Sequence, residues 1–289
     1  MEETFRIKKI SVWIFIVPVV VLNACLFISV NWELFQHTIF QVDEIGKSAY
    51  TLPYIDGGTS ISRSARTYPA YLLFKPGMII TAILLILYWF ENNRLFKKIN
   101  NRLKNEYFLI FGVGSAIFLI MHSIFLGINF EADPYKFFRR FILLGFIIFE
   151  VIAQTLLVIN IFKNKKKIES SINKKILVLK IILVSLLIVV AFVSAPILNS
   201  SNYTHFKHAL EWNYFLGVVC FYLLTFLFWK GKTQVHTPEG AWTKVLVRRW
   251  MRYRRTRRPS MFSATLQGFL LGKLEPLGLS LPGQLRVAS

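Results

Sequence analysis

Three polar side chains lie inside long apolar stretches of the sequence, where they could take part in chemistry that needs a dry environment. Glu150 and Gln154 are four residues apart, so they share one face of an α-helix. His122 lies in the middle of another apolar stretch. An ionisable side chain costs about 2.5–3.5 kcal/mol at the centre of a membrane helix and therefore needs a function or a partner. The spacing predicts that Glu150 and Gln154 point into a helix bundle and form interhelical hydrogen bonds, and a proton-linked role is the alternative.

A second set of charged residues lies near the ends of apolar stretches, at one expected membrane depth. Its members are Lys75, Arg139, Arg140 and Glu211. Arginine binds phosphate through two hydrogen bonds at once, so Arg139 and Arg140 are the better anchors for a lipid phosphate, with Glu211 as counter-charge. The alternative is that these cations reach the membrane surface with their long side chains, as we expect for Lys180 near the opposite end. Adjoining loops add Arg63, Arg66, His205 and His208.

The segment 31–69 is the longest connection between apolar stretches and contains roughly forty residues, a length more typical of functional loops than of simple connections. Proline and a glycine pair in it favour a defined turn, which an aspartate can stabilise by hydrogen bonds. We predict either a structural plug packed on the helices or a lid over the basic residues. The motif residues are Pro53, Tyr54, Asp56, Gly57 and Gly58.

Catalytic machinery is not evident in the sequence. It contains neither an HExxH nor a GxSxG motif, and its two cysteines, Cys25 and Cys220, lie far apart in separate apolar stretches. A single histidine in the middle of an apolar stretch is too few for an intramembrane zinc site with three histidines. We therefore predict no catalytic residue, no metal and no cofactor. An acyl-transfer enzyme would need a serine of segment 31–69 beside His205 or His208, which is a weak alternative.

The elements that must position these residues are membrane-spanning helices. Hydrophobic residues make up 54% of the 289-residue chain and charged residues 17%, which is too apolar for an ordinary soluble domain. The apolar residues form blocks of about twenty, the length at which an α-helix crosses a hydrocarbon core. The sequence therefore predicts an all-α, polytopic membrane protein with a six-helix bundle. The expected spans are 10–30, 70–90, 107–130, 137–162, 176–197 and 209–229.

The distribution of positive charge predicts the orientation of this bundle. The net charge is +20, and such an excess in a membrane protein normally faces the cytoplasm and its anionic lipids, so nucleic acid is not an expected partner. With the N-terminus inside, the inner segments before residue 233 hold 16 Lys and Arg residues and the outer segments hold 7. The positive-inside rule then places both termini in the cytoplasm.

The last segment, 233–289, has a different composition from residues 1–232. It is basic through eight arginines and contains neither isoleucine nor asparagine. We interpret it either as a genuine cytoplasmic tail or as the product of read-through or frame-shifted translation. Within it, the range 242–258 mixes apolar residues with arginines, which suits an anionic membrane surface, although a disordered basic tail is the alternative.

The chain resembles the Frag/DRAM/Sfk family of six-span membrane proteins over about residues 8–230. The resemblance rests on the spans, on Pro53-Tyr54-Ile55-Asp56-Gly57-Gly58-Thr59 in the first outer loop, and on Glu211-Trp212 in the last span. The motif matches neither the autophagy-modulator branch nor the branch that remodels GPI lipids closely. The family implies a role in membrane-lipid organisation, GPI-type lipid remodelling or autophagy-linked membrane processes. It implies membrane lipids, anionic or GPI-type, as partners, and no assigned catalytic residue.

Two functions are therefore expected from different sites. The leading hypothesis is a non-enzymatic integral membrane protein that recognises lipid headgroups at its outer face. The alternative is a proton-coupled small-molecule transporter that uses Glu150, Gln154 and His122, and it predicts a water-filled cavity that reaches Glu150.

Overall fold

The computed structural model describes residues 2–99, 107–127, 133–199 and 202–230. The predicted tail, 233–289, and the basic range 242–258 within it lie outside the described residues.

The described part is all-α, as predicted, and six of its helices have the length and apolar composition needed to cross a membrane. An α-helix pairs its backbone groups internally, which suits a hydrocarbon environment. The protein is therefore an integral, multi-pass membrane protein. The helices are α1 (Glu2–Val30), α3 (Ala70–Ile99), α4 (Tyr107–Phe125), α5 (Asp133–Lys163), α7 (Lys174–Asn199) and α8 (Thr204–Phe228). Helices α1, α3 and α7 each contain one proline, Pro18, Pro76 and Pro196, which donates no backbone hydrogen bond.

Most of these helices extend beyond the apolar segments expected from the sequence. Helix α1 begins at Glu2 instead of residue 10, and α3 continues to Ile99 instead of ending near residue 90. Charged residues continue these helices past the hydrocarbon, because a helix satisfies its own backbone in water as well as in lipid. Helix α4 ends earlier than expected, at Phe125, and is followed by Gly127 with a φ of 85°.

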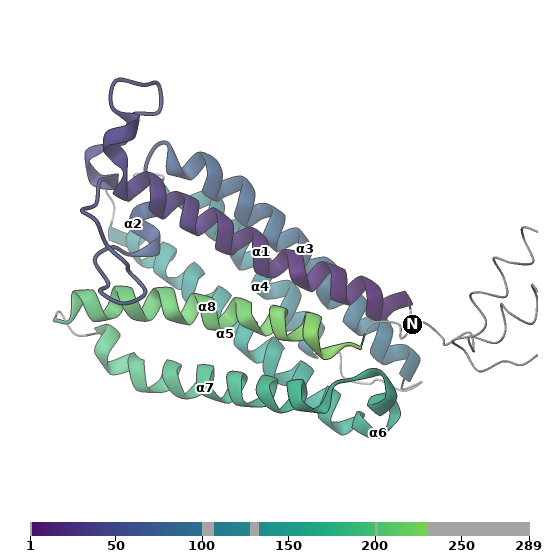
Figure 1. Ribbon diagram of the computed structural model, residues 1–289. Coiled ribbons are helices and arrows are strands. Elements are labelled where there is room, and N and C mark those ends of the chain that lie inside the picture. Colours follow the sequence, from purple (N-terminus) through teal and green to yellow (C-terminus); the bar gives the residue numbers. More distant parts are fainter. Residues whose placement is uncertain (1, 100–106, 128–132, 200–201, 231–289) are drawn as a thin grey trace, which may run out of the picture. The chain divides into compact units, whose positions relative to one another are not determined.

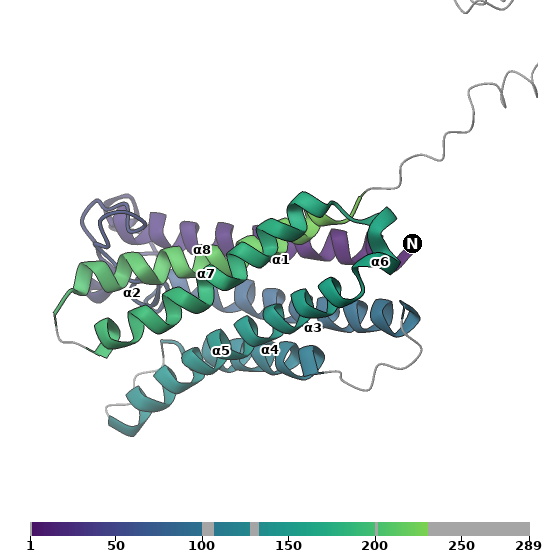
Figure 2. The same cartoon turned by 90° about the horizontal axis from the view of Figure 1, so that it is seen from below.

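The six long helices run alternately in opposite directions (Figures 1 and 2). Helix α1 packs on α3 and α8, α4 packs between α3 and α5, and α7 contacts both α8 and α5. In Figure 1 the N-terminus is at the end of the bundle drawn on the right, and the segment between α1 and α3 is at the other. We call these the N-terminal end and the loop end.

Small residues allow close approach between neighbouring helices. A Cβ atom on Gly77 of α3 would lie 2.4 Å from Val21 of α1, and one on Gly112 of α4 would lie 2.3 Å from the buried ring of Trp89. Close packing of this kind holds membrane helices together, since lipid tails are as apolar as the side chains. Large apolar side chains such as Val20 face outward, as expected for contact with lipid.

Short elements occupy both ends of the bundle. At the loop end, the first loop contains η1 (Trp32–Phe35), η2 (Glu44–Gly46) and α2 (Ile61–Ala65). At the N-terminal end, α6 (Lys165–Ile168) and η3 (Glu169–Ser171) connect α5 to α7. An antiparallel bridge between Ile172 and Trp229 joins this connection to the end of α8.

Candidate functional site

Glu150 lies in the interior of the bundle, on the middle of α5, and is fully buried. Three side chains surround its carboxyl group. Ser115 Oγ of α4 lies 2.6 Å from Oε2, and Gln154 Nε2 donates to Oε1 at 3.0 Å. The Tyr222 hydroxyl of α8 also donates to Oε1. The structure therefore places Glu150 in interhelical hydrogen bonds, in agreement with its spacing from Gln154.

Gln154 extends this contact between α5 and α8. Its Nε2 atom also donates to the backbone oxygen of Val218 at 3.2 Å, and its side chain is fully buried. Its Oε1 atom has no hydrogen-bond partner among the described residues. The Glu150–Gln154 pair thus contacts both neighbouring helices and keeps one free acceptor.

Lys180 of α7 is fully buried, so the prediction that it reaches the membrane surface is wrong. Its Nζ atom donates to Thr225 Oγ1 of α8 at 2.8 Å and lies 4.0 Å from the centroid of the Phe221 ring. The Phe228 ring is 5.3 Å away on the same helix. A hydroxyl and two aromatic faces therefore contact the ammonium group. These contacts replace the water that would otherwise solvate its charge.

Two tyrosines lie between the Glu150 and Lys180 groups. The hydroxyl of Tyr88 on α3 lies 3.3 Å from Thr225 Oγ1, and its ring meets the edge of the Tyr222 ring at a centroid distance of 5.0 Å. We call the whole set the polar ladder. Its members, all at most 1% exposed, are Ser115, Glu150, Gln154, Tyr222, Tyr88, Thr225 and Lys180.

Sequence reasoning identified Glu150 and Gln154 in this ladder but missed its hydroxyl groups. A usable signal was present on α8, where Tyr222 and Thr225 are three residues apart on one face of an apolar helix. The partners on other helices carry no such signal, because no local sequence pattern encodes which helices pack together.

His122 does not join the ladder. It is buried on α4, where the centroids of its ring and the Phe74 ring are 6.3 Å apart in an edge-to-face arrangement, and its Nδ1 atom has no partner in the described ranges. It is seven residues from Ser115 toward the loop end, or about 10 Å along the helix. The structure therefore brings together two of the three polar residues predicted for the interior and separates the third.

Arg139 lies near Arg66 at the loop end of the bundle. Burial lowers the pKa of the Arg66 guanidinium, and the nearby positive charges of Arg139 and Arg63 lower it further. No ion pair joins Arg66 or Arg139 to any acidic side chain that the structure describes, a set that leaves out Glu131 and Asp133 before Arg139. The two arginines therefore form a region of positive charge that no described side chain neutralises.

The other predicted headgroup residues have separate surroundings. Arg140 is exposed, and Lys75 Nζ lies 5.3 Å from the centroid of the Tyr71 ring. Glu211, the expected counter-charge, is hydrogen-bonded to the backbone N–H groups of Ile61 and Ser62. Its carboxyl group therefore holds the first turn of α2.

The loop motif packs on the first turns of α8. Trp212 Nε1 donates to the backbone oxygen of Thr59 at 3.0 Å, and Asn213 Nδ2 donates to that of Tyr54 at 2.7 Å. The Tyr54 ring also meets the Trp212 ring at 5.0 Å. These contacts favour the interpretation of the segment as a structural plug that covers this end of the bundle.

Backbone requirements explain the residues at the centre of this motif. Gly57 has a φ of 63°, and a Cβ atom there would lie 1.7 Å from the backbone oxygen of His205. The same glycine's oxygen accepts a hydrogen bond at 3.0 Å from the His208 ring. Gly58 likewise faces Thr51, and Pro53 is buried. Gly57 is therefore needed for the loop to approach α8, and Gly58 for the loop to fold back on its own Thr51.

Asp56 closes the turn of the motif with three hydrogen bonds. Its carboxylate accepts from the Thr51 hydroxyl, from the N–H of Leu52 at 2.8 Å and from the N–H of Gly58 at 2.9 Å. The Thr51 hydroxyl and the two N–H groups hold the pKa of Asp56 below its ordinary value of 3.8, because each stabilises the ionised form.

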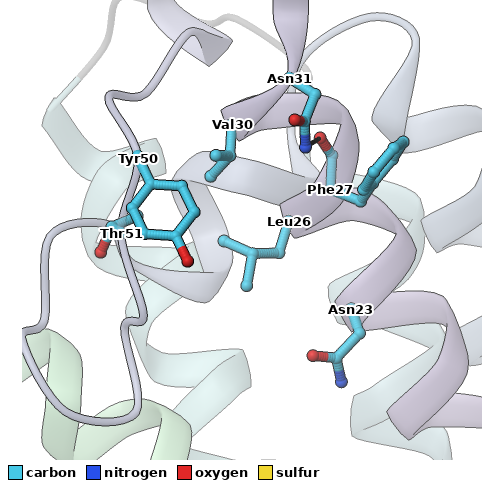
Figure 3. A pocket seen from close by; sticks show the side chains of 7 residues that line it. All are labelled: Asn23, Leu26, Phe27, Val30, Asn31, Tyr50 and Thr51. Atoms are coloured by element: carbon cyan, nitrogen blue, oxygen red, sulfur yellow. Dashed lines mark hydrogen bonds between the residues drawn. The ribbon is translucent and has the colours of Figure 1, made fainter.

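A pocket of about 190 Å³ lies between α1 and the first loop (Figure 3). Helix α1 contributes apolar side chains and Asn23, which donates to the Tyr54 hydroxyl at 3.1 Å. Phe27, another lining residue, is half exposed. The lining residues are Asn23, Leu26, Phe27, Val30, Asn31, Tyr50 and Thr51.

In comparisons with protein-family models, with curated proteins and with solved structures, no match to the chain was found. The resemblance to the Frag/DRAM/Sfk family therefore rests on the loop motif, on Glu211-Trp212 and on the six spans.

Proposed function

We propose that this integral membrane protein binds the phosphate group of an anionic or GPI-type membrane lipid at its loop end, without catalysing a reaction on it. The observation that carries this proposal is the pair Arg66 and Arg139, whose positive charge no described acidic side chain neutralises. Two guanidinium groups at this depth match the position of a lipid phosphate and bind it with paired hydrogen bonds.

The fold supports this role because it fixes the position of Arg66. Glu211 holds the start of α2, and Arg66 follows directly at its C-terminal cap. Gly127, after α4, approaches the backbone oxygen of Arg66 so closely that a Cβ atom there would lie 2.7 Å from it. Arg66 is therefore held between α8 and the α4–α5 connection, beside Arg139 of α5.

The family resemblance agrees with this proposal. Membrane-lipid organisation, GPI-type lipid remodelling and autophagy-linked membrane processes all need a protein that recognises lipid headgroups. Binding of a lipid phosphate is enough to explain why two arginines lie together without an acidic partner among the described residues, so the proposal assigns no catalytic residue.

The experiment is mass spectrometry of lipids that co-purify with the full chain in mild detergent. Wild type should carry an anionic or GPI-type lipid above its share of the host membrane, and the Arg66→Ala/Arg139→Ala variant should lose that enrichment. The matched control is Lys75→Ala/Arg140→Ala, which removes two other cations of the loop end and should keep the lipid. Equal bulk lipid in all three proteins would show that the arginines are interfacial anchors.

The transporter hypothesis has less support. It requires Glu150, Gln154 and His122 at one site, whereas His122 lies closer to the loop end, beside Phe74. Glu150 is fully buried and hydrogen-bonded to side chains of three helices. These contacts fill the surroundings of Glu150 with protein side chains, so they do not favour a solute-binding site there.

A further inference from the structure

We propose that Glu150 is a proton-binding site in the middle of the bundle, and that its proton exchanges with the N-terminal end of the protein along the polar ladder. The ligand of this site is the proton itself. The inference does not depend on lipid binding, because it uses none of the residues at the loop end.

The first argument is that the surroundings of Glu150 satisfy both forms of its carboxyl group. Ser115 Oγ lies 2.6 Å from Glu150 Oε2 and 2.8 Å from the backbone oxygen of Gly112, but a hydroxyl has a single hydrogen to donate. With Glu150 protonated, Oε2–H donates to Ser115, and Ser115 donates to Gly112. With Glu150 ionised, Ser115 turns and donates to Oε2. A proton can therefore bind or leave when one hydroxyl rotates.

The remaining contacts of the carboxyl group stay the same in both forms. Oε1 accepts from Tyr222 and from Gln154 whether or not Oε2 carries a proton. Neither form leaves a carboxyl oxygen without a partner, which would destabilise that form. Protonation consequently forms one O–H bond at Oε2 and needs no rearrangement of the helices.

The second argument is the asymmetry of polar groups along the bundle axis. On the N-terminal side of Glu150 the interior contains the hydroxyls of Tyr222, Tyr88 and Thr225, followed by the ammonium group of Lys180. Asn92, one turn beyond Tyr88 on α3, is also buried and donates to the Tyr88 backbone oxygen at 2.8 Å. Two hydrogen-bonded groups, Glu150 with Tyr222 and Thr225 with Tyr88 and Lys180, therefore follow one another toward this end, and the Tyr88 and Tyr222 rings join them by edge contact.

On the loop side of Glu150 the buried residues include Leu85 on α3, Leu119 on α4, Leu187 on α7 and Val218 on α8, each at most 6% exposed. One turn beyond Leu85 and Leu119, the hydroxyls of Thr81 and Ser123 are buried as well, and each donates to a backbone oxygen of its own helix. Hydrocarbon side chains offer no site for a proton or for ordered water. Among the described residues, no hydrogen-bonded side chains link Glu150 to the loop end, so the ladder loads Glu150 from one side without conducting protons across the membrane.

Glu150 and Lys180 are ionisable groups that are fully buried in the bundle. Burying them costs free energy, and apolar residues would fill the same space without this cost. Glu150 and Lys180 both point at α8, one through Tyr222 and the other through Thr225. The titratable groups that face Glu150 are Tyr222 of α8 and Tyr88 of α3, with Lys180 of α7 reached through Thr225.

The first test is infrared spectroscopy of the purified full chain over a pH series. We expect a carbonyl band of a protonated carboxyl group that titrates with pH and that the Glu150→Gln variant lacks. Absence of such a band in wild type, or its persistence in Glu150→Gln, would overturn the proposal.

The second test follows the shift of this band after transfer to deuterated water. Tyr222→Phe and Thr225→Val should each slow deuteration of Glu150 by about tenfold, the effect of one lost hydrogen bond on the exchange route. Tyr214→Phe is the matched control, because Tyr214 is on α8 and its buried hydroxyl has no partner among the described residues. It should leave the rate unchanged. If Tyr222→Phe does not fold, the deuteration rate of Thr225→Val alone tests the route. Deuteration of Glu150 at the wild-type rate in the ladder variants would refute the proposed route.

Discussion

Lys180 and Ser115 are the two residues whose surroundings the sequence predicts least well. A lysine close to a helix end normally extends to the membrane surface, but here Phe221, Phe228 and Thr225 of α8 meet its ammonium group inside the protein. A serine in an apolar helix normally bonds its own backbone, but Ser115 also reaches Glu150. In both cases a side chain from another helix determines where the polar group points.

Lys180→Met should fold at least as well as wild type. Methionine fills a similar space without a buried charge, and Thr225 keeps its hydrogen bond to the Phe221 backbone oxygen. Lys180→Glu should destabilise the fold, since it places a carboxylate against two aromatic faces. Thermal unfolding of the two variants in the same detergent checks this. Equal loss of stability in both would mean that the ammonium group itself stabilises the bundle.

Ser115→Ala should lower the free energy of unfolding by about 1–3 kcal/mol, because it leaves Glu150 Oε2 without a partner. Ser123→Ala is the matched control: Ser123 is also buried on α4, but its hydroxyl donates to the backbone oxygen of Leu119. Ser123→Ala should lower the free energy of unfolding by less than Ser115→Ala does. Unfolding monitored by circular dichroism compares the two, and equal effects would show that the contact between Ser115 and Glu150 contributes no stability.

Helices and loops differ in how far the sequence predicts them. The six apolar stretches predict six helices, because composition alone determines which segments prefer lipid. Their ends are less predictable, since charged residues such as Arg6 and Lys98 continue the helices outside the apolar stretch. The contact of the first loop with α8 depends on hydrogen bonds from Trp212 and Asn213 to backbone groups more than 150 residues away. No local pattern encodes that contact.

Acidification should loosen the first loop through Asp56. Its pKa in the folded protein lies below the ordinary value of 3.8, so its contribution to loop order is complete above that value. The contribution is lost as the pH falls through the lower folded pKa, because protonation removes acceptors for Thr51, Leu52 and Gly58. Asp56→Asn should have the same effect at neutral pH.

Hydrogen–deuterium exchange with mass spectrometry measures this change. After correction for the intrinsic pH dependence of exchange, residues 51–58 should exchange faster in Asp56→Asn, while the middle of α5 should not. Glu44→Gln is a suitable control, since Glu44 is exposed elsewhere in the first loop and contacts Lys47. Unchanged protection of residues 51–58 in Asp56→Asn would mean that the contacts with α8 order the loop alone.

At the scale of the whole molecule, the bundle has two ends with different chemistry. The loop end carries the Arg66–Arg139 pair and a folded plug, and the N-terminal end carries the polar side of the ladder. The positive-inside rule predicts that the N-terminal end faces the cytoplasm. Glu150 would then exchange its proton with the cytoplasm, and the arginine pair would meet lipids of the opposite leaflet.

Cysteine labelling tests this orientation. In a Cys25→Ala/Cys220→Ala background, Tyr50→Cys and Lys166→Cys place single thiols at exposed positions of opposite ends. In sealed right-side-out vesicles, a membrane-impermeant maleimide should label position 50 at once and position 166 after permeabilisation. The reverse pattern would invert the orientation and exchange the compartments assigned to the two ends.

Lipid recognition at the arginine pair is the central claim, and thermal stability in the presence of defined lipids tests it most directly. A ligand that binds the folded state at about one hundred times its Kd stabilises that state by about 2.7 kcal/mol. An anionic phospholipid should therefore raise the Tm of wild type above its value with a zwitterionic lipid, and Arg66→Ala/Arg139→Ala should abolish that difference while Lys75→Ala/Arg140→Ala keeps it. The same rise in all three proteins would contradict headgroup binding by Arg66 and Arg139.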